Sequence, residues 1–276
     1  MRKLLRANFA RLWKDKVFWC GLIVLAGYGV LGCLSQYRAV LDGYDGSSYY
    51  ELVFFNDYIL NSVIFAAFVN LFLGCEYSDG TIRNKLVTGA SRTVIYCSNY
   101  ITCAGAGILM QFFYSVVVSV LGIPMFGWNP ESLGSMFVYS GLGILLICSE
   151  MAVFTLVSML CQNKAAAAVL CQIGAFAMLF AALYLMSRLA QPEMLEVVKE
   201  SADGSAVIET VRNTAYLSGR TRSLYQFGMD FLPAGQGFAI AGQGTEHPGL
   251  LAVYSLIVIL GCNVGGILGF KRKDLK

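Results

Sequence analysis

Residues 76–86, EYSDGTIRNKL, form a short charged segment between two long apolar runs. The preceding run, residues 58–75, carries no charged side chain, and neither does the following run, residues 93–130. A hydrocarbon core of about 30 Å takes roughly 20 helical residues to cross, so both runs are long enough to hold a span. The charged segment is therefore expected at a membrane surface.

The composition of this segment predicts a short helix. Ser78 or Asp79 is a suitable N-cap, because either side chain can accept a hydrogen bond from a free backbone N–H. Arg83 and Lys85 fall toward the other end of the helix, where the helix dipole favours positive charge. The same residues also fit a surface loop that does no more than join two spans.

The segment also resembles the cytoplasmic loop of type-2 ABC permeases, the membrane subunits of bacterial ABC exporters. The likeness runs over the whole chain, but only this segment is specific. It consists of Glu76, then Gly80-Thr81-Ile82-Arg83-Asn84-Lys85-Leu86, then the turn Gly89-Ala90-Ser91-Arg92. In that family the loop is a coupling helix that docks on a separate ATPase subunit.

The resemblance implies a role for each residue of the coupling segment. Polar contacts with the ATPase partner are expected from Glu76, Asp79, Arg83 and Lys85. Ile82 and Leu86 stand four residues apart on one helix face and would fill a groove on the partner. Gly80 and Thr81 complete the set of residues assigned to coupling.

Two further stretches support the resemblance. Residues 269–276, GFKRKDLK, are similar to the way type-2 permeases end. Phe231-Leu232-Pro233-Ala234-Gly235-Gln236 resembles a Leu-Pro-x-Gly-Gln element of the bacitracin and lantibiotic resistance branch. Pro233 and Gly235 make this stretch a poor spanning helix, so we expect it to enter the membrane and return, with protein or water satisfying its backbone.

The composition places the whole chain in a membrane. Its 276 residues are 57% hydrophobic and 13% charged, which excludes an ordinary soluble domain. A net charge of +3 gives a nucleic-acid partner no electrostatic support. The nine cysteines lie in or beside apolar runs and show no zinc-type spacing, so they are interpreted as small apolar residues. Neither a metal site nor a catalytic residue is predicted.

The hydropathy pattern predicts an all-α polytopic membrane protein with one permease domain, residues 1–276. An amphipathic helix in residues 1–16 precedes six spans, with Leu5, Phe9, Leu12 and Trp13 on its apolar face. A long polar segment, residues 188–247, separates the last two spans and contains apolar patches at 194–198 and 207–211 that we interpret as helical. The six spans are predicted at residues 17–37, 57–75, 94–123, 134–161, 165–187 and 249–270.

The distribution of basic residues orients these spans. With both termini in the cytoplasm, 14 of the 20 lysine and arginine residues lie on the inner side. The segment 188–247 is then extracellular, and Asp57 is counted among the acidic residues of the outer side. We expect the protein in the cytoplasmic membrane of a bacterial cell.

Glu150 stands alone as a charge within an apolar span. A buried carboxylate in the bilayer normally faces protein or water and marks a site. Glu150 would pair with a cationic substrate or hold a contact between subunits. It fits equally well as a hydrogen-bonded residue that joins its span to a neighbour such as Gln111 or Gln172.

The chain has no Gly-x-x-x-x-Gly-Lys-Ser/Thr loop to bind nucleotide phosphates. We therefore expect a transport subunit, not an enzyme, with ATP and magnesium bound by a partner ATPase and a second permease subunit completing a dimer. The cargo would be an amphipathic compound or an antimicrobial peptide, moved outward. Two alternatives stay open: a proton-coupled secondary transporter that uses Glu150, and a non-transporting sensor or scaffold subunit.

Overall fold

The computed structural model describes residues 1–44, 46, 49–200, 206–245 and 247–273. The end of the tail that resembles type-2 permeases, residues 274–276, lies outside this description, as do residues 201–205 and 246 of the long polar segment. The described chain is mostly helical, as predicted.

Five helices within the described residues are long and apolar enough to cross a membrane. A sixth candidate is a helix pair, Tyr49–Ile59 and Asn61–Ser78, which bends by 43° at its break. The apolar helices agree with a multi-pass membrane protein. The five are α2 (Lys16–Leu41), α6 (Arg92–Phe126), α7 (Leu133–Leu160), α8 (Lys164–Leu189) and α11 (Pro248–Arg272), and the turn η2 (Pro130–Ser132) precedes α7.

The second span, predicted as one helix over residues 57–75, is in the structure the second part of this bent pair. The structure has α3 (Tyr49–Phe55), a 3₁₀ turn η1 (Asn56–Ile59) and then α4 (Asn61–Ser78). Asparagine and aspartate side chains compete for backbone hydrogen bonds and favour helix ends over helix interiors. A break in this stretch, which is rich in such residues, is therefore consistent with its composition.

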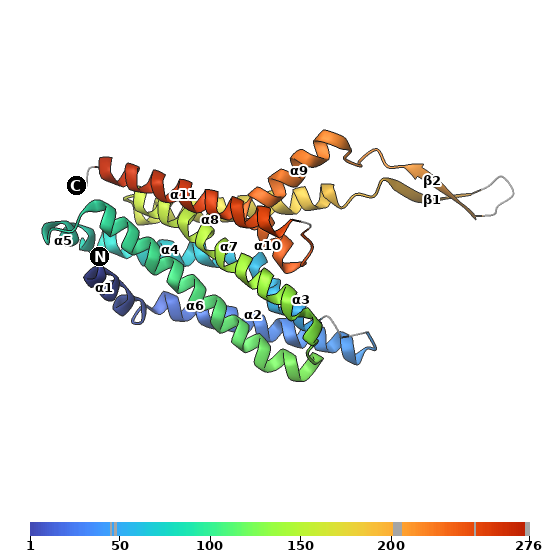
Figure 1. The fold of residues 1–276 in the computed structure, drawn as a ribbon, viewed down its shortest axis with the longest axis horizontal. Helices are drawn as coiled ribbons and strands as arrows, with labels where there is room; N and C mark the ends of the chain where they lie inside the picture. Colours follow the sequence, from blue (N-terminus) through green and yellow to red (C-terminus); the bar gives the residue numbers. More distant parts are fainter. Residues whose placement is uncertain (45, 47–48, 201–205, 246, 274–276) are drawn as a thin grey trace.

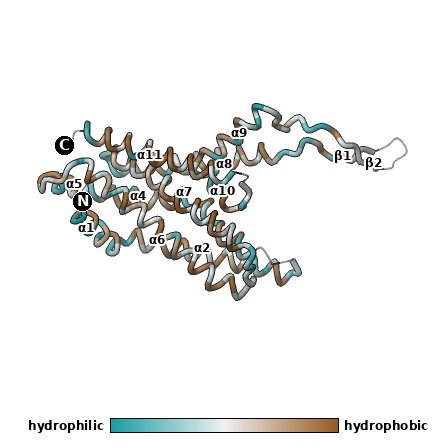
Figure 2. Tube along the Cα trace, in the orientation of Figure 1, coloured by the Kyte–Doolittle hydropathy of each residue, from teal (hydrophilic) through white to brown (hydrophobic). Residues whose placement is uncertain are grey.

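The helices run roughly along the long axis of the molecule (Figure 1). α2 packs along α6, α11 packs along α7, and α4 contacts both α7 and α8. Both termini and the short helix α5 (Thr81–Val87) gather at one end, whereas α3 lies near the other (Figure 1). Hydrophobic residues dominate the long helices, and hydrophilic ones gather around α1, α5 and α9 (Figure 2).

The N-terminal helix is α1 (Arg2–Leu12), which packs on α6. Leu12 is buried, and Phe9 packs against Gly105 of α6. Trp13 departs from the prediction because it lies beyond the helix end and stays 52% exposed. Its ring contacts Phe18 of α2 edge-on, with centroids 5.8 Å apart.

The long polar segment contains a β-hairpin, which corrects the helical interpretation of its apolar patches. β1 (Met194–Glu200) and β2 (Ala206–Arg212) pair antiparallel with Val198 opposite Ile208. β1 contains Val197 and Val198, and β2 contains two valines, an isoleucine and a threonine. Such β-branched residues favour extended backbone. The hairpin projects from the end opposite α5 (Figure 1).

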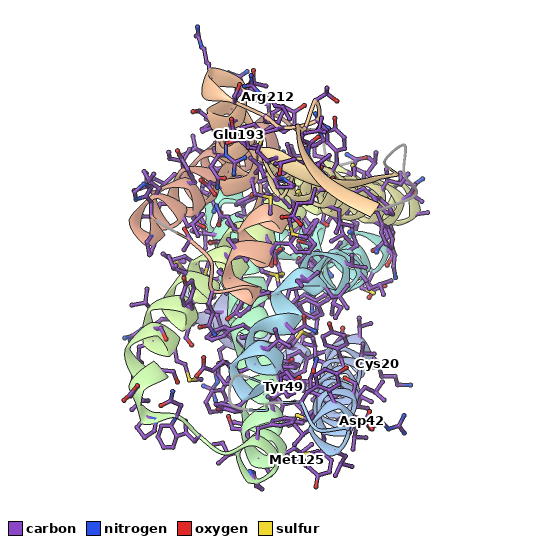
Figure 3. All side chains as sticks on the ribbon, turned by 90° about the vertical axis from the view of Figure 1, so that its right-hand side faces the viewer. Cys20, Asp42, Tyr49, Met125, Glu193 and Arg212 are labelled. Carbon is purple, nitrogen blue, oxygen red and sulfur yellow. The ribbon has the colours of Figure 1, made fainter. Side chains whose placement is uncertain are left out.

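In the view from the hairpin end, the base of the hairpin and the helices α2, α3 and α6 lie on opposite sides of the molecule (Figure 3). Glu193 and Arg212, at the base of the hairpin, lie on one side with 4.0 Å between their charged groups. Asp42, Tyr49 and Met125 mark the other side, around α2, α3 and α6 (Figure 3). After the hairpin, α9 (Gly219–Phe231) and α10 (Pro233–Ala241) lead into α11.

Candidate functional site

The charged segment forms the end of α4 and a separate short helix, α5. Gly80 precedes α5 in the left-handed conformation, with φ 66°. The predicted caps are therefore wrong: Ser78 is the last residue of α4, and Asp79 follows it as the C-cap. Glycine adopts positive φ at little cost, so it permits the turn between the two helices.

α5 has a buried face and an exposed face. Ile82 is only 2% exposed and belongs to the hydrophobic core, and Leu86 packs against that core. Ile82 therefore fills the interior of its own chain and not a groove on a partner, contrary to the expectation. Leu86 is partly buried, and its contact with a partner stays a prediction. Arg83 and Asn84 are exposed, and Val87 is 86% exposed. These three residues define what we call the outer face of α5.

Glu76 lies at the centre of a buried polar cluster. Its side chain is 0% exposed, its Oε1 accepts from Arg11 Nη1 at 2.6 Å, and the same oxygen pairs with Lys85 Nζ. Asn99 Nδ2 donates to Oε2 at 2.8 Å. Asn8 completes the cluster by donating to Asn99 Oδ1 at 2.9 Å and accepting from Lys85 Nζ at 3.1 Å.

These five residues, the Glu76 hub, come from α1, α4, α5 and α6. Glu76 and Lys85 were expected to contact the ATPase, but both turn inward and bind within the chain. Burial lowers the pKa of Lys85 below its ordinary value, while the Glu76 carboxylate opposes this shift. A buried carboxylate with two cationic partners and an amide donor has its desolvation compensated. The hub therefore fixes α5 to three other helices.

The sequence held one weak signal for the hub. Asn8 falls on the same face of α1 as Leu12, and both are buried. A polar residue at helical spacing within an apolar face indicates a buried hydrogen-bonding partner. Asn99, by contrast, lies within an uncharged run, and no local pattern distinguishes it.

The Gly-x-Ser-Arg turn joins this end of the molecule to the tail. Ser91 caps α6, with its Oγ accepting from Val94 N at 3.3 Å. Arg92 Nη1 donates to the carbonyl of Phe270 at 3.1 Å and to that of Lys271 at 2.9 Å. Arg92 therefore holds the C-terminal end of α11 against the start of α6.

Glu150 is buried in α7, 1% exposed. Its Oε1 accepts a hydrogen bond from Ser62 of α4, and its Oε2 has no partner among the described residues. The predicted neighbours are therefore wrong. Gln111 instead accepts from Asn61 Nδ2 at 3.1 Å. Glu150 thus links α7 to α4 through Ser62, and a functional role for it stays a prediction.

Asp57, counted above among the acidic residues of the outer side, is a second buried carboxylate. It lies in η1 with 0% exposure, and its Oδ2 is 3.5 Å from Asn61 Nδ2. The spacing of four residues between Asp57 and Asn61, beside an apolar run, was the signal available for this pair. Its burial depends on α10, which packs over η1 and comes from a distant part of the chain.

The predicted re-entrant element is a sharp corner between two helices. Phe231 ends α9, Leu232 is extended, and Pro233 begins α10. Gln236 is 1% exposed; its Nε2 donates to the Asp230 carbonyl at 2.8 Å, and its Oε1 accepts from Ser255 Oγ at 2.6 Å. Gln236 therefore ties the corner to α11.

A family model described as ABC-2 family transporter protein matches residues 4–185, from α1 through most of α8. The chain belongs to the ABC-2 transporter family. A comparison with curated proteins found no match.

The ABC-2 match agrees with the type-2 permease resemblance of the charged segment. It includes the Glu76 hub, α5, Asp57 and Glu150, and ends before the hairpin, α9, α10 and α11. ABC-2 permeases are membrane transport components without a nucleotide-binding domain of their own. The family implies an ABC ATPase as partner. The bacitracin and lantibiotic branch stays a prediction.

Proposed function

We propose that this ABC-2 protein is the permease subunit of an ATP-driven exporter and that α5 is its coupling helix. The single observation that carries the proposal is the pairing of an exposed outer face with a fixed inner face on α5. Arg83, Asn84 and Val87 point outward, while Ile82 and Lys85 are anchored in the chain. A helix held in this way transmits a push on its outer face to the helices behind it.

The Glu76 hub connects α5 to those helices. A displacement of α5 reaches α4 through Glu76, α1 through Arg11 and Asn8, and α6 through Asn99. Packed cores and satisfied polar networks deform little, so they pass on rigid-body movement. Closure of a partner ATPase, with ATP and magnesium bound there, would thus tilt two spanning helices together.

The proposed orientation rests on the distribution of basic residues, and the proposed dimer rests on the number of spans. The positive-inside rule puts α5 and both termini in the cytoplasm of a bacterial cell, and the hairpin outside. Six spans are few for a sizeable pathway, which favours a dimer with a second permease subunit. The cargo we propose is an amphipathic compound or an antimicrobial peptide.

The outer face of α5 provides the test. We expect the double variant Arg83→Glu, Val87→Asp to lose the partner ATPase on purification and to lower transport-linked ATP hydrolysis at least tenfold, because the few hot-spot residues of an interface each contribute about 2 kcal/mol or more. Both residues are exposed, so the fold should be unaffected.

The matched control for this test is Asp42→Arg, an exposed charge reversal at the C-cap of α2. It should retain the ATPase. Equal retention by the α5 variant would contradict the coupling role of this helix.

Glu150→Gln separates an ATP-driven exporter from a proton-driven carrier. Glutamine keeps the size of Glu150 and can still accept from Ser62, so we expect ATP-driven transport to change less than about twofold. A proton-coupled carrier would lose transport, because the amide cannot bind and release a proton at this position. Transport into vesicles, measured with and without a proton gradient, checks this prediction.

A further inference from the structure

A cavity of about 710 Å³ lies at the end of the molecule opposite α5. It is partly open, and it is lined by the C-terminal end of α8, by α9 and α10, and by the first turns of α11. Small-molecule sites commonly have volumes of about 300–1,000 Å³. This cavity lies beyond the region that the family model matches, so the family assignment does not account for it.

One part of the cavity wall is apolar and aromatic. Leu189 of α8 and Leu250 of α11 contribute aliphatic surface, and Phe227 and Tyr254 contribute rings. These two rings meet at right angles, with centroids 5.7 Å apart. A wall of this kind suits a hydrocarbon chain or ring.

Another part of the wall is cationic. Arg222 lines the cavity from α9, and its guanidinium lies over the ring of Tyr216 at 5.4 Å. Its Nη1 is buried without a hydrogen-bond partner, and within the described residues Arg222 forms no ion pair. An unsatisfied buried donor on a charged group is costly, so a group that can accept from this guanidinium is favoured there.

Asp230 is the acidic residue of this wall, and it is already engaged. Its Oδ1 accepts from Gln226 Nε2 at 2.9 Å. Burial raises the pKa of Asp230 above its ordinary value. Among the described residues no ion pair joins Asp230 to Arg222, so the guanidinium of Arg222 keeps its charge available for an anionic group.

We propose that this cavity binds an amphipathic molecule with a phosphate or carboxylate head. The head contacts the guanidinium of Arg222, and the apolar part lies against Leu189, Phe227 and Tyr254. Such a molecule reaches the cavity either from the bilayer, as an anionic lipid, or from solution, as a free amphiphile. The proposal needs no ATPase partner, so its failure and a failure of the coupling role of α5 are distinguishable.

Binding to the full chain tests the proposal. Native mass spectrometry of the purified protein would measure retention of two probes, phosphatidylglycerol for the bilayer source and dodecyl phosphate for the soluble source. We expect at least one probe to bind the wild type and Arg222→Gln to weaken that binding about tenfold, because a hydrogen bond to a charged group contributes that much. Whichever probe binds more tightly identifies the source.

Two further variants make the test specific. Arg220→Gln removes an exposed charge from the same helix outside the cavity and should bind like the wild type. Ala190→Trp places an indole in the cavity from an exposed position and should abolish binding while leaving thermal unfolding unchanged. Binding that survives Ala190→Trp, falls equally with both arginine variants, or is absent for both probes would overturn the proposal.

Discussion

Replacing Glu76 with glutamine is expected to lower the free energy of unfolding by about 3 kcal/mol. The carboxylate is fully buried and faces Arg11, Lys85 and Asn99 at once. Glutamine keeps the volume but leaves Lys85, whose side chain is 13% exposed, without a counter-charge. The cost comes mainly from this uncompensated cation, since Arg11 is 31% exposed and can reach water. Thermal and denaturant unfolding of the purified protein measure it.

Two further variants distinguish the stabilising effect of the Glu76 hub from the effect of removing any surface charge. Asp79→Asn removes an exposed carboxylate three residues away and should change the free energy of unfolding by less than about 0.5 kcal/mol. Adding Lys85→Met to Glu76→Gln removes the stranded cation and should restore part of the loss, because apolar replacement of a buried pair is often neutral. Equal effects of Glu76→Gln and Asp79→Asn would contradict the structural role of the hub.

Gly235→Ala is expected to destabilise the protein by about 3 kcal/mol or more, through a backbone clash at the α9–α10 corner. A Cβ on Gly235 would lie 2.9 Å from the carbonyl carbon of Met229 and closer still to its oxygen. The backbone of α9 would have to move, and it also carries the Asp230 carbonyl that Gln236 binds. The unfolding temperature and the yield of monodisperse protein check this expectation.

The matched control is Gly261→Ala in α11. A Cβ there meets no atom within 4 Å, and alanine is the better helix former by up to about 1 kcal/mol. This variant should be as stable as the wild type or slightly more so. If both glycine variants behaved alike in detergent, the close approach at the corner would not be a constraint on the fold.

The sequence alone was sufficient for the membrane class and for the approximate position of five long helices. Hydropathy is a local property, so an uncharged run of about 20 residues can be recognised as a spanning helix from its own sequence, without knowledge of the residues that pack around it. The resemblance of the charged segment to type-2 permeases agrees with the ABC-2 family match. Local pattern failed in the hairpin, where β-branched residues decided the backbone of two patches interpreted as helical.

Which charged residues face water was decided by the tertiary structure. Glu76 and Lys85 belong to a charged surface segment, yet both turn inward because Asn8 and Asn99, from distant parts of the chain, complete their hydrogen bonds. Asp57 is buried because α10, from the far end of the chain, covers η1. The free energy of burying a charge depends on partners that only folding assembles, and no window of sequence contains them.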